Sequence, residues 1–429
     1  MTSAEVAPKR RRLSAEDRRA QIISVAREVF IEFGHSAALM RVVAQRANIA
    51  EPFLYRHFHS KEDLYQAAVL DPLDEFVDGI TAEIHELAQR SDIPRAQILE
   101  HFHQLFLSQM AELAPLIVAT LYSDSQDGAD LYNRVLLPRV REVSGEIIAD
   151  ISGRDTSTFD LDVLTKALIG VYFGLAVENA IVGGVWDSRR LGHELATLFA
   201  NGITPDRKRR SAEMAAGSAI PIEPFTLELA PSLELATRPR VPREERRELV
   251  HVAAREVFVE VGQRRARTKD IAERAGITEA FMYRIVDSKE QLYRDSVVVP
   301  FAEGVAEFAD RVKVLSAITT GVAFVQAFNE LSLRFFAVYG QIGGLTLLSE
   351  PVEGRQVFND VLRAPLAQLE KALGKGSGID PDTVDLQVAR RAILGAQCVI
   401  ALDGNGAVDP QREKELARGL TVLFTGGIR

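Results

Sequence analysis

Hydrophobic residues in the first part of the chain recur at the three- and four-residue spacing of an amphipathic helix. Over residues 16–33 they form one stripe that stops at Gly34, with the members Ile22, Ile23, Ala26, Val29, Phe30 and Phe33. One apolar stripe followed by glycine predicts a core-facing helix that ends near that glycine. Shorter patterns predict a second helix over 41–47, a turn over 48–50 and a third helix over 51–58. Ile49 of the turn and Leu54 of the third helix are expected to fill the space between the helices.

This pattern returns without a gap 228 positions later. Arg27-Glu28-Val29-Phe30 repeats as Arg255-Glu256-Val257-Phe258, and Ser60-Lys61-Glu62 repeats as Ser288-Lys289-Glu290. A period this long indicates two copies of a domain-sized unit, because solenoid repeats run at about 20–50 residues. We therefore expect each copy to fold around its own core.

The region after each copy also reads as helical. Breaks are expected at 92–94, at Pro115 and at 124–128, and two final helices are expected at 160–181 and 189–200. These final helices recur at an offset of 225, so that Gly170 matches Gly395. Their apolar faces include Leu164, Leu168, Val171, Leu175, Ile393, Leu394 and Val399. The whole chain is therefore expected to be all-α.

Residues 204–242 lack this periodicity and are rich in proline, which predicts a linker between the copies. Within it, residues 225–229 alternate like a strand, and we expect them to lie against the helices as extended chain. The domain boundaries that follow are 1–65, 66–203, 204–242, 243–293 and 294–429.

Charge divides unevenly along the chain. The net charge is −9, yet residues 1–70 hold 11 Lys and Arg against 8 Asp and Glu, and residues 238–299 hold 14 against 11. Each of these segments is therefore positive within an otherwise acidic chain, an arrangement suited to binding phosphates at one end. Solvated surface charge is the alternative explanation.

Other composition features narrow the classes of protein. The single cysteine, Cys398, cannot form an intrachain disulfide and reads as a small core residue, which fits a reducing, cytoplasmic location. No stretch reads as a signal peptide or a membrane span. His101 and His103 point about 200° apart on a helix, so no metal site is expected. Residues 374–378 resemble a phosphate loop only superficially, and a flexible connection is expected there. No cofactor is expected.

The stretch from Arg41 to Leu64, RVVAQRANIAEPFLYRHFHSKEDL, resembles the signature of TetR-type transcriptional regulators. The resemblance implies a three-helix DNA-binding domain with a helix-turn-helix, followed by a helical ligand-binding and dimerisation domain. In a helix-turn-helix the second helix enters the major groove while the first crosses the backbone. The repeat predicts two such units in one chain.

The resemblance also indicates the residues that contact DNA. Tyr55, His57 and Lys61 are expected at phosphates, and Glu51, Pro52 and Arg56 near base edges. The complete set expected at double-stranded DNA is Arg41, Glu51, Pro52, Phe53, Tyr55, Arg56, His57, Lys61, Thr268, Lys269, Thr278, Glu279, Ala280, Tyr283, Arg284 and Lys289. The second copy departs from the first at Ile285, which replaces His57, and it gains Thr278 as an N-cap. The basic run at 9–12 is either an arm that reaches the minor groove or a disordered tail.

An effector pocket is expected in the helical bodies, for a small and largely apolar ligand. The residues assigned to it are His103, Phe106, Tyr122, Tyr172, Asn179, Phe328, Phe335, Tyr339 and Gln397. Aromatic residues at helical spacing are more often core than pocket, so the region is better defined than its residues.

Three functional hypotheses follow. The leading one is a ligand-responsive transcriptional repressor that binds an asymmetric operator as an intramolecular pseudo-dimer, with a monomeric chain. In the second, the chain is a helical small-molecule or protein-binding module in which one or both DNA-binding copies are inactive. The third is a helical enzyme, for which no constellation of catalytic residues is found.

Overall fold

A computed structural model of the chain confirms the all-α fold class over the residues that it describes, which contain no β-strand. The described residues are 14–121, 137–138, 140–142, 144–145, 160–182, 187–201, 221–225, 242–348, 351–379, 384–402 and 410–426. The basic run at 9–12 and the break expected at 124–128 lie outside them.

The first copy begins with three helices, α1 (Ala15–Ala37), α2 (Met40–Arg46) and α3 (Glu51–His57). The turn between α2 and α3 depends on Asn48, which adopts a φ of 54°, and asparagine tolerates this left-handed conformation better than most residues. Leu54 is fully buried and Ile49 is partly buried against the same core, as the sequence predicts.

The second copy repeats this arrangement with α12 (Arg243–Arg265), α13 (Thr268–Arg274) and α14 (Glu279–Met282). Gly276 occupies the position of Asn48 and has a φ of 67°. Both turns therefore use a residue that accepts a positive φ, which explains how different residue types produce the same helix-turn-helix angle.

Matched contacts attach each helix-turn-helix to the segment that follows it. Arg27 Nε donates to the Ala68 carbonyl oxygen at 3.1 Å, and Arg255 Nε donates to that of Ser296 at 2.8 Å. The acceptors lie in equivalent π-helical segments, η1 (Gln66–Leu70) and η5 (Arg294–Val298). Edge-to-face ring pairs, Phe30 with Tyr65 and Phe258 with Tyr293, repeat in the same way. The repeat in the sequence therefore corresponds to a repeat of the same core contacts in the structure.

Longer helices form the bodies of the two halves. In the first half they are α5 (Asp71–Ala88), α6 (Arg95–Leu121), α9 (Leu161–Val182) and α10 (Ser188–Asn201), after the short α4 (Lys61–Tyr65). In the second half they are α16 (Val299–Ile318), α17 (Gly321–Leu348), α18 (Pro351–Val357), η6 (Phe358–Leu362), α19 (Arg363–Ser377), α20 (Leu386–Leu402) and α21 (Pro410–Gly426), after α15 (Lys289–Tyr293).

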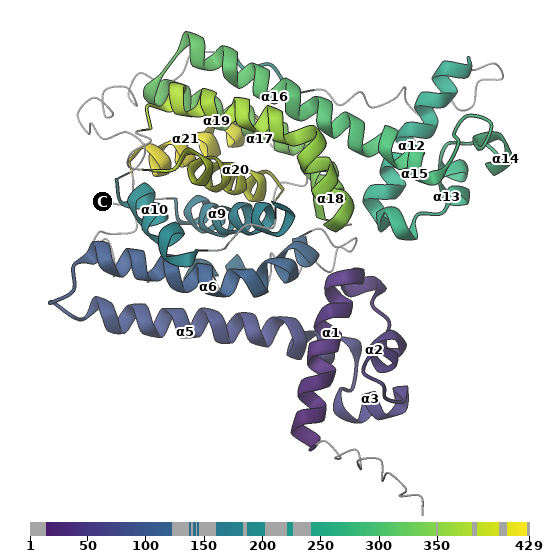
Figure 1. The fold of residues 1–429 in the computed structure, drawn as a ribbon, viewed down its shortest axis with the longest axis horizontal. Coiled ribbons are helices and arrows are strands. Elements are labelled where there is room, and N and C mark those ends of the chain that lie inside the picture. The colour runs from purple at the N-terminus through teal and green to yellow at the C-terminus, as the bar shows by residue number, and fades with distance from the viewer. Residues whose placement is uncertain are drawn as a thin grey trace, which may run out of the picture.

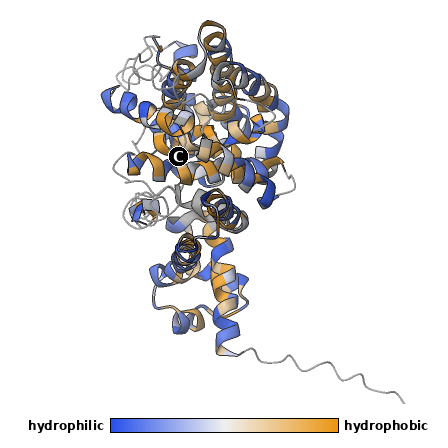
Figure 2. Cartoon of the chain, turned by 90° about the vertical axis from the view of Figure 1, so that its left-hand side faces the viewer, coloured by the Kyte–Doolittle hydropathy of each residue, from blue (hydrophilic) through white to orange (hydrophobic). Residues whose placement is uncertain are grey.

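The two halves meet where α9 crosses α20. A Cβ placed on Gly170 would collide with the carbonyl oxygen of Gly395, and one placed on Gly395 would collide with that of Gly170. Figure 1 shows α9, α10, α20 and α21 as a central layer, with α5 and α6 on one side and α16, α17 and α19 on the other. Hydrophobic residues are concentrated in the packed helices, and hydrophilic residues on the outward faces (Figure 2).

Three local expectations are wrong. The first helix does not end at Gly34, because α1 continues through this residue to Ala37; its counterpart Gly262 has a φ of 75° and kinks α12. Pro115 does not break α6, because the loss of one backbone donor is a local defect in a helix that continues on both sides. The loop expected at 374–378 is the last turn of α19, where Gly376 admits the Phe324 ring and Gly378 ends the helix with a φ of 75°.

A short piece of the linker, residues 221–225, lies across the second half. Arg311 donates to the carbonyl oxygen of Glu223 at 3.0 Å and stacks over the Phe225 ring at 4.2 Å. Phe225 is buried, and its ring contacts Phe308, Phe335 and Tyr339. The extended packing expected for Phe225 is present, whereas residues 226–229 lie outside the described residues.

Candidate DNA-binding surface and ligand cavity

The second helix of each helix-turn-helix presents exposed side chains. Tyr55 is 45% exposed and Tyr283 is 51% exposed, although both are large and partly apolar. Arg56, Arg284 and their neighbours Glu51, Pro52, Phe53, Glu279 and Ala280 are also exposed. Figure 1 places α3 and α14 at the same end of the molecule, on the right of the view. The residues predicted from sequence for DNA contact are therefore available at one end.

The second helices of the two helix-turn-helix units, α3 and α14, differ in length and in capping. Helix α3 spans seven residues and has no side-chain cap, because Ala50 stands at its N-cap. Helix α14 spans four residues, and Thr278 caps it by accepting a hydrogen bond from the Phe281 amide at 3.2 Å. Ile285 therefore lies beyond the end of α14, whereas its counterpart His57 is the last residue of α3. The predicted N-cap is confirmed, and the two surfaces differ in backbone as well as in side chains.

Polar residues around α14, in the second copy, form hydrogen bonds with one another. Tyr283 donates to Thr268 Oγ1 at 3.3 Å, and Thr268 donates to Glu279. Lys289 Nζ donates to the carbonyl oxygens of Gln263 at 3.0 Å and Ala266 at 3.4 Å. These contacts engage groups that the sequence assigns to DNA, and the Lys289 ammonium group is directed toward backbone carbonyl oxygens.

The remaining predicted DNA residues lie around the same helices. Arg41 is exposed on α2, and Lys61 is half-buried at the start of α4. Phe53 and His57 form an edge-to-face pair with ring centroids 5.0 Å apart on α3. Lys269 forms an ion pair with Glu273 at 3.6 Å on α13.

The two DNA-binding units also contact each other. Arg265, at the end of α12, donates to the carbonyl oxygen of Phe33 in α1 at 3.3 Å. Within the first unit, Arg46 lies over the Phe33 ring, with its guanidinium carbon 5.5 Å from the ring centroid. The hydrogen bond from Arg265 is therefore a direct contact between the two units.

A cavity of about 160 Å³ lies in the second half and reaches the crossing of α9 and α20. Its walls are mainly apolar side chains of α16, α17, α19 and α20, and α9 of the first half completes one side with Phe173 and Val177. An engineered apolar cavity of about 150 Å³ holds benzene, so this space accommodates a ring or a short chain. Gly340, Gly343 and Gly344 of α17 also line the cavity, and the Phe301 ring packs directly against Gly343.

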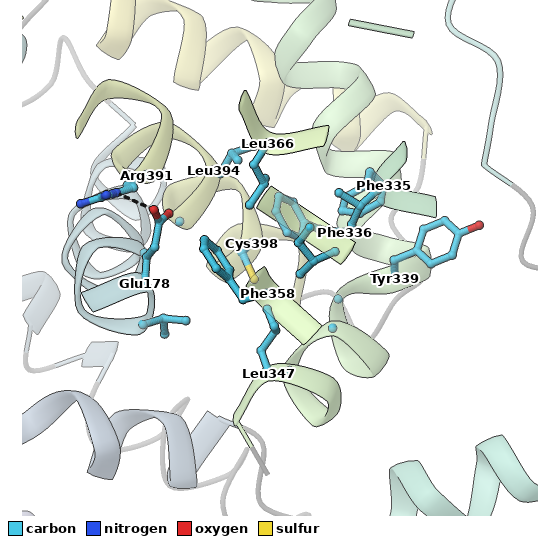
Figure 3. Close-up of a pocket in the computed structure, with 18 of the residues that line it drawn as sticks. Glu178, Phe335, Phe336, Tyr339, Leu347, Phe358, Leu366, Arg391, Leu394 and Cys398 are labelled. Carbon is cyan, nitrogen blue, oxygen red and sulfur yellow. Dashed lines mark ion pairs between the residues drawn. The ribbon is translucent and has the colours of Figure 1, made fainter. Parts of the chain in front are cut away.

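Charged side chains line one side of this cavity. Glu178 of α9 forms an ion pair with Arg391 of α20, whose Nε lies 3.0 Å from Glu178 Oε1, and with Arg390, whose Nη2 lies 2.9 Å from both carboxylate oxygens. Figure 3 shows Arg391 and Glu178 at one side of the cavity and Tyr339 at the other, with Phe336, Phe358 and Cys398 between them. The cavity is thus apolar along its length and ionic at one end.

Most of the residues assigned to a ligand in the first half form a packed core instead. His103 Nδ1 and the Tyr172 hydroxyl share a buried hydrogen bond, and the Phe106 ring stacks on Tyr172 with centroids 4.0 Å apart. Burial lowers the pKa of His103 to about 3 and raises that of Tyr172. Asn179 is half-buried on α9, and Tyr122 lies outside the described residues.

A different polar pair occupies the corresponding place in the second half. His103 and Asn329 are both the ninth residue of their helices, α6 and α17, and Tyr172 matches Gln397 at the offset of 225. Gln397 Nε2 donates to Asn329 Oδ1 at 2.6 Å, and Asn329 Nδ2 donates to Thr421 Oγ1 at 3.0 Å. Gln397 is therefore a buried structural group and does not line the cavity. Phe328 is likewise fully buried and stacks on Phe324.

Of the predicted ligand residues, Phe335 and Tyr339 line the cavity. Sequence reasoning missed its charged wall, Glu178, Arg390 and Arg391, because these residues come from separate halves. The glycines at 340, 343 and 344 were the available signal, since repeated glycine on one helical face leaves space beside it.

No described group of three or more His, Cys, Asp or Glu side chains is arranged to hold a metal ion. None of the described helices combines the length and apolar character needed to cross a bilayer.

The comparisons with known proteins agree with the duplicated geometry. The family described as "Bacterial regulatory proteins, tetR family" matches twice, at residues 22–68 and 251–295. The HTH-type transcriptional activator FasR of Mycolicibacterium smegmatis is 35% identical over 91 residues, which are 21% of this chain and 42% of FasR. This chain therefore matches less than half the length of FasR.

Two other similarities cover one copy each. The fatty acid metabolism regulator protein of Bacillus subtilis is 28% identical over 187 residues, 43% of this chain and 94% of that protein. A solved TetR-like transcriptional regulator from Rhodococcus sp. RHA1 is 22% identical with a TM-score of 0.34, covering 43% of this chain and 96% of that structure. The two matches to the family, on two helix-turn-helix units with equivalent contacts, show that this chain contains two TetR-type helix-turn-helix domains in tandem.

Proposed function

We propose that the chain is a ligand-responsive repressor that binds an asymmetric operator as an intramolecular pseudo-dimer. The observation that carries this proposal is the crossing of α9 and α20 at Gly170 and Gly395, two residues that are equivalent by duplication. Equivalent residues meet at a two-fold axis in a symmetric dimer. Here the two partners are halves of one chain, with domains at 1–65, 66–203, 243–293 and 294–429 and a linker at 204–242.

Both helix-turn-helix units then act on one DNA molecule. In two-fold proteins of this class, half-sites lie about 34–36 Å apart or at a multiple of that distance. The placement of α3 and α14 at one end, and the hydrogen bond from Arg265 to Phe33, support joint binding. We assign Tyr55, Arg56 and Lys61 to the first half-site and Tyr283, Arg284 and Lys289 to the second.

The operator is asymmetric in this proposal because the two recognition surfaces are unequal. Helix α3 carries Pro52 and His57, whereas α14 is shorter and carries Ala280 with Ile285 beyond its end. Contacts shared by both copies position the protein on phosphates, and side chains that differ read different bases. An operator with two different half-sites follows.

The effector is a small and largely apolar molecule bound in the cavity of the second half. The cavity has walls from both halves, so an occupant acts directly on the α9–α20 crossing. One relative is named for fatty acid metabolism, which supports an acyl chain as the apolar part of the ligand. Ligand and operator then bind with reciprocal coupling, because each favours one spacing of the recognition helices.

Repression is the simplest outcome of such binding. A protein that occupies an operator at a promoter excludes polymerase, and a ligand that weakens operator binding restores transcription. FasR is named as an activator. A reporter gene driven by the operator therefore tests directly whether this chain represses or activates transcription. Higher expression on deletion of the gene supports repression, and lower expression rules it out.

Operator binding is tested by gel shift of the whole chain on the DNA that flanks its own gene. A sequence-selective shift whose logarithmic affinity falls linearly with the logarithm of salt concentration is expected. The double variants Tyr55→Ala/Lys61→Ala and Tyr283→Ala/Lys289→Ala then report on each copy. A pseudo-dimer loses affinity in both, and it runs in solution as a species of 47.3 kDa. A complex of twice that mass at low concentration contradicts the pseudo-dimer.

A second candidate function is a helical binding module in which the second DNA-binding copy is inactive. The contacts of Lys289 with Gln263 and Ala266, and the short α14, favour it. Under this function the Tyr283→Ala/Lys289→Ala variant binds DNA as well as the parent chain does.

A further inference from the structure

The ionic side of the cavity has more hydrogen-bond donors than acceptors. Arg390 is 5% exposed and Arg391 lies beside it, and both pair with the single carboxylate of Glu178. Arg390 Nε lies 3.7 Å from Glu370 Oε2, too far for a hydrogen bond. Among the described residues, Arg390 Nε has no hydrogen-bond partner, and Arg391 Nε lies 3.0 Å from Glu178 Oε1 without the geometry of a hydrogen bond. Two guanidinium groups, of which Arg390 is buried, therefore share the one carboxylate of Glu178.

These two guanidinium groups lie at the end of an apolar space. Phe358, Leu394 and Cys398 line the cavity next to the Arg391–Glu178 pair (Figure 3). A molecule that fills the apolar part and extends toward α9 thus reaches these guanidinium groups with its end. The arrangement matches an amphipathic molecule with one anionic end, since guanidinium recognises carboxylate in a planar, bidentate geometry.

We propose that the cavity binds a straight-chain carboxylate whose carboxylate group replaces Glu178 at Arg390 and Arg391. This inference rests on the proposed ligand response and names its chemical class. The exchange swaps one carboxylate for another on the same guanidinium groups, so the buried positive charge stays compensated. A neutral ester of equal chain length fills the same apolar space and leaves Glu178 in place.

The exchange has a consequence for the two halves. Glu178 belongs to α9 of the first half, whereas Arg390 and Arg391 belong to α20 of the second. The ion pair therefore ties the halves together beside the Gly174–Arg391 backbone contact. When the ligand carboxylate takes over the arginines, Glu178 is released from α20, and the halves lose one charged link at their crossing.

The test compares octanoate with methyl octanoate by calorimetric titration of the full chain. The proteins are the parent chain, Glu178→Gln, Arg391→Gln and the control Arg190→Gln. The control removes a different ion pair between the halves, that of Arg190 with Asp385, which lies at the surface away from the cavity. Thermal unfolding confirms that each variant is folded.

The informative quantity is the affinity for octanoate divided by that for the ester. Removal of the competing carboxylate in Glu178→Gln is expected to raise this ratio at least about tenfold, and Arg391→Gln is expected to lower it by a similar factor, as for loss of one partner of a buried charge pair. Arg190→Gln leaves the ratio unchanged. A merely structural role of the ion pair changes both affinities together and leaves the ratio constant.

The outcomes separate this inference from the function on which it rests. If both compounds bind and the ratio is the same in all four proteins, carboxylate exchange is wrong while the ligand response survives. If neither compound binds to any of them, both the exchange and the proposed apolar effector are wrong. If Glu178→Gln does not fold, the ratio in Arg391→Gln against the parent chain decides the question alone.

Discussion

Gly170 and Gly395 lie back to back, each occupying the space that a side chain on the other would need. They are equivalent residues of a duplicated chain, and they allow α9 and α20 to cross with their backbones in contact. Small residues permit such close approach, and any larger residue must push the helices apart. The crossing is therefore sensitive to the addition of a single methyl group.

Gly395→Ala is expected to destabilise the chain by about 1–3 kcal/mol, the usual cost of overpacking a tight contact. Gly79→Ala is the matched control, because Gly79 is also helical and a Cβ there meets nothing within 4 Å. That change is expected to stabilise α5 by about 0.5–1 kcal/mol. Urea unfolding measures both, and equal effects at the two positions contradict the close crossing.

Exchange of the N-caps tests the difference between the recognition helices. Thr278→Ala removes the hydroxyl that caps α14 and is expected to cost about 1 kcal/mol, whereas Ala50→Thr adds a cap to α3 and is expected to stabilise it by a similar amount. Hydrogen exchange of the amides of α3 and α14 localises each effect. Protection that is unchanged at Phe281 in Thr278→Ala contradicts the cap.

The buried His103 makes stability depend on pH. Its pKa is lowered from 6.5 to about 3 by burial, so below pH 6.5 the unfolded chain takes up a proton that the folded chain does not. Stability from this group is full above pH 6.5 and is lost as the pH falls toward 3, at about 1.4 kcal/mol per pH unit. When the pH is lowered from 7 to 5, the free energy of unfolding of His103→Asn is expected to fall by about 2 kcal/mol less than that of the parent chain.

The control for this measurement is His101→Asn, on the same helix. The His101 side chain is 39% exposed and pairs with Glu83 at the surface. Urea unfolding of the parent chain and both variants at pH 7 and pH 5 measures the change in the free energy of unfolding. If His103→Asn retains the full loss of stability at pH 5, then His103 accepts a proton in the folded chain.

Phe225 links the linker to the cavity. Its ring packs on Phe308, Phe335 and Tyr339, and all three line the cavity. Phe225→Ala is expected to cost about 3–5 kcal/mol, as for other buried aromatic truncations, and to speed proteolysis of the linker. Glu223→Ala, at an exposed position two residues earlier, is the control. Equal proteolysis rates for the two variants contradict a docked linker.

The comparison of sequence and structure shows which kinds of feature a pattern predicts. Helix periodicity and the repeat of Arg27–Phe30 predicted the fold class, the duplication and the exposed recognition residues, because local spacing determines these. Pro115 and Gly34 were misjudged, since proline and glycine bias a backbone that packing on either side then controls. The residues 374–378 were misjudged for the same reason, because the Phe324 ring requires glycine where the sequence suggests a loop.

The sequence alone therefore determined that two TetR-type units follow one another, since each helix-turn-helix signature is contained in a continuous stretch. Only the tertiary structure decided that Gly170 meets Gly395, that Glu178 pairs with Arg390 and Arg391, and that Phe225 packs behind the cavity. These contacts join residues far apart in the chain, and even the repeat that matches Gly170 with Gly395 does not by itself bring the two together. Their formation depends on how apolar helix faces bury each other once both halves are folded.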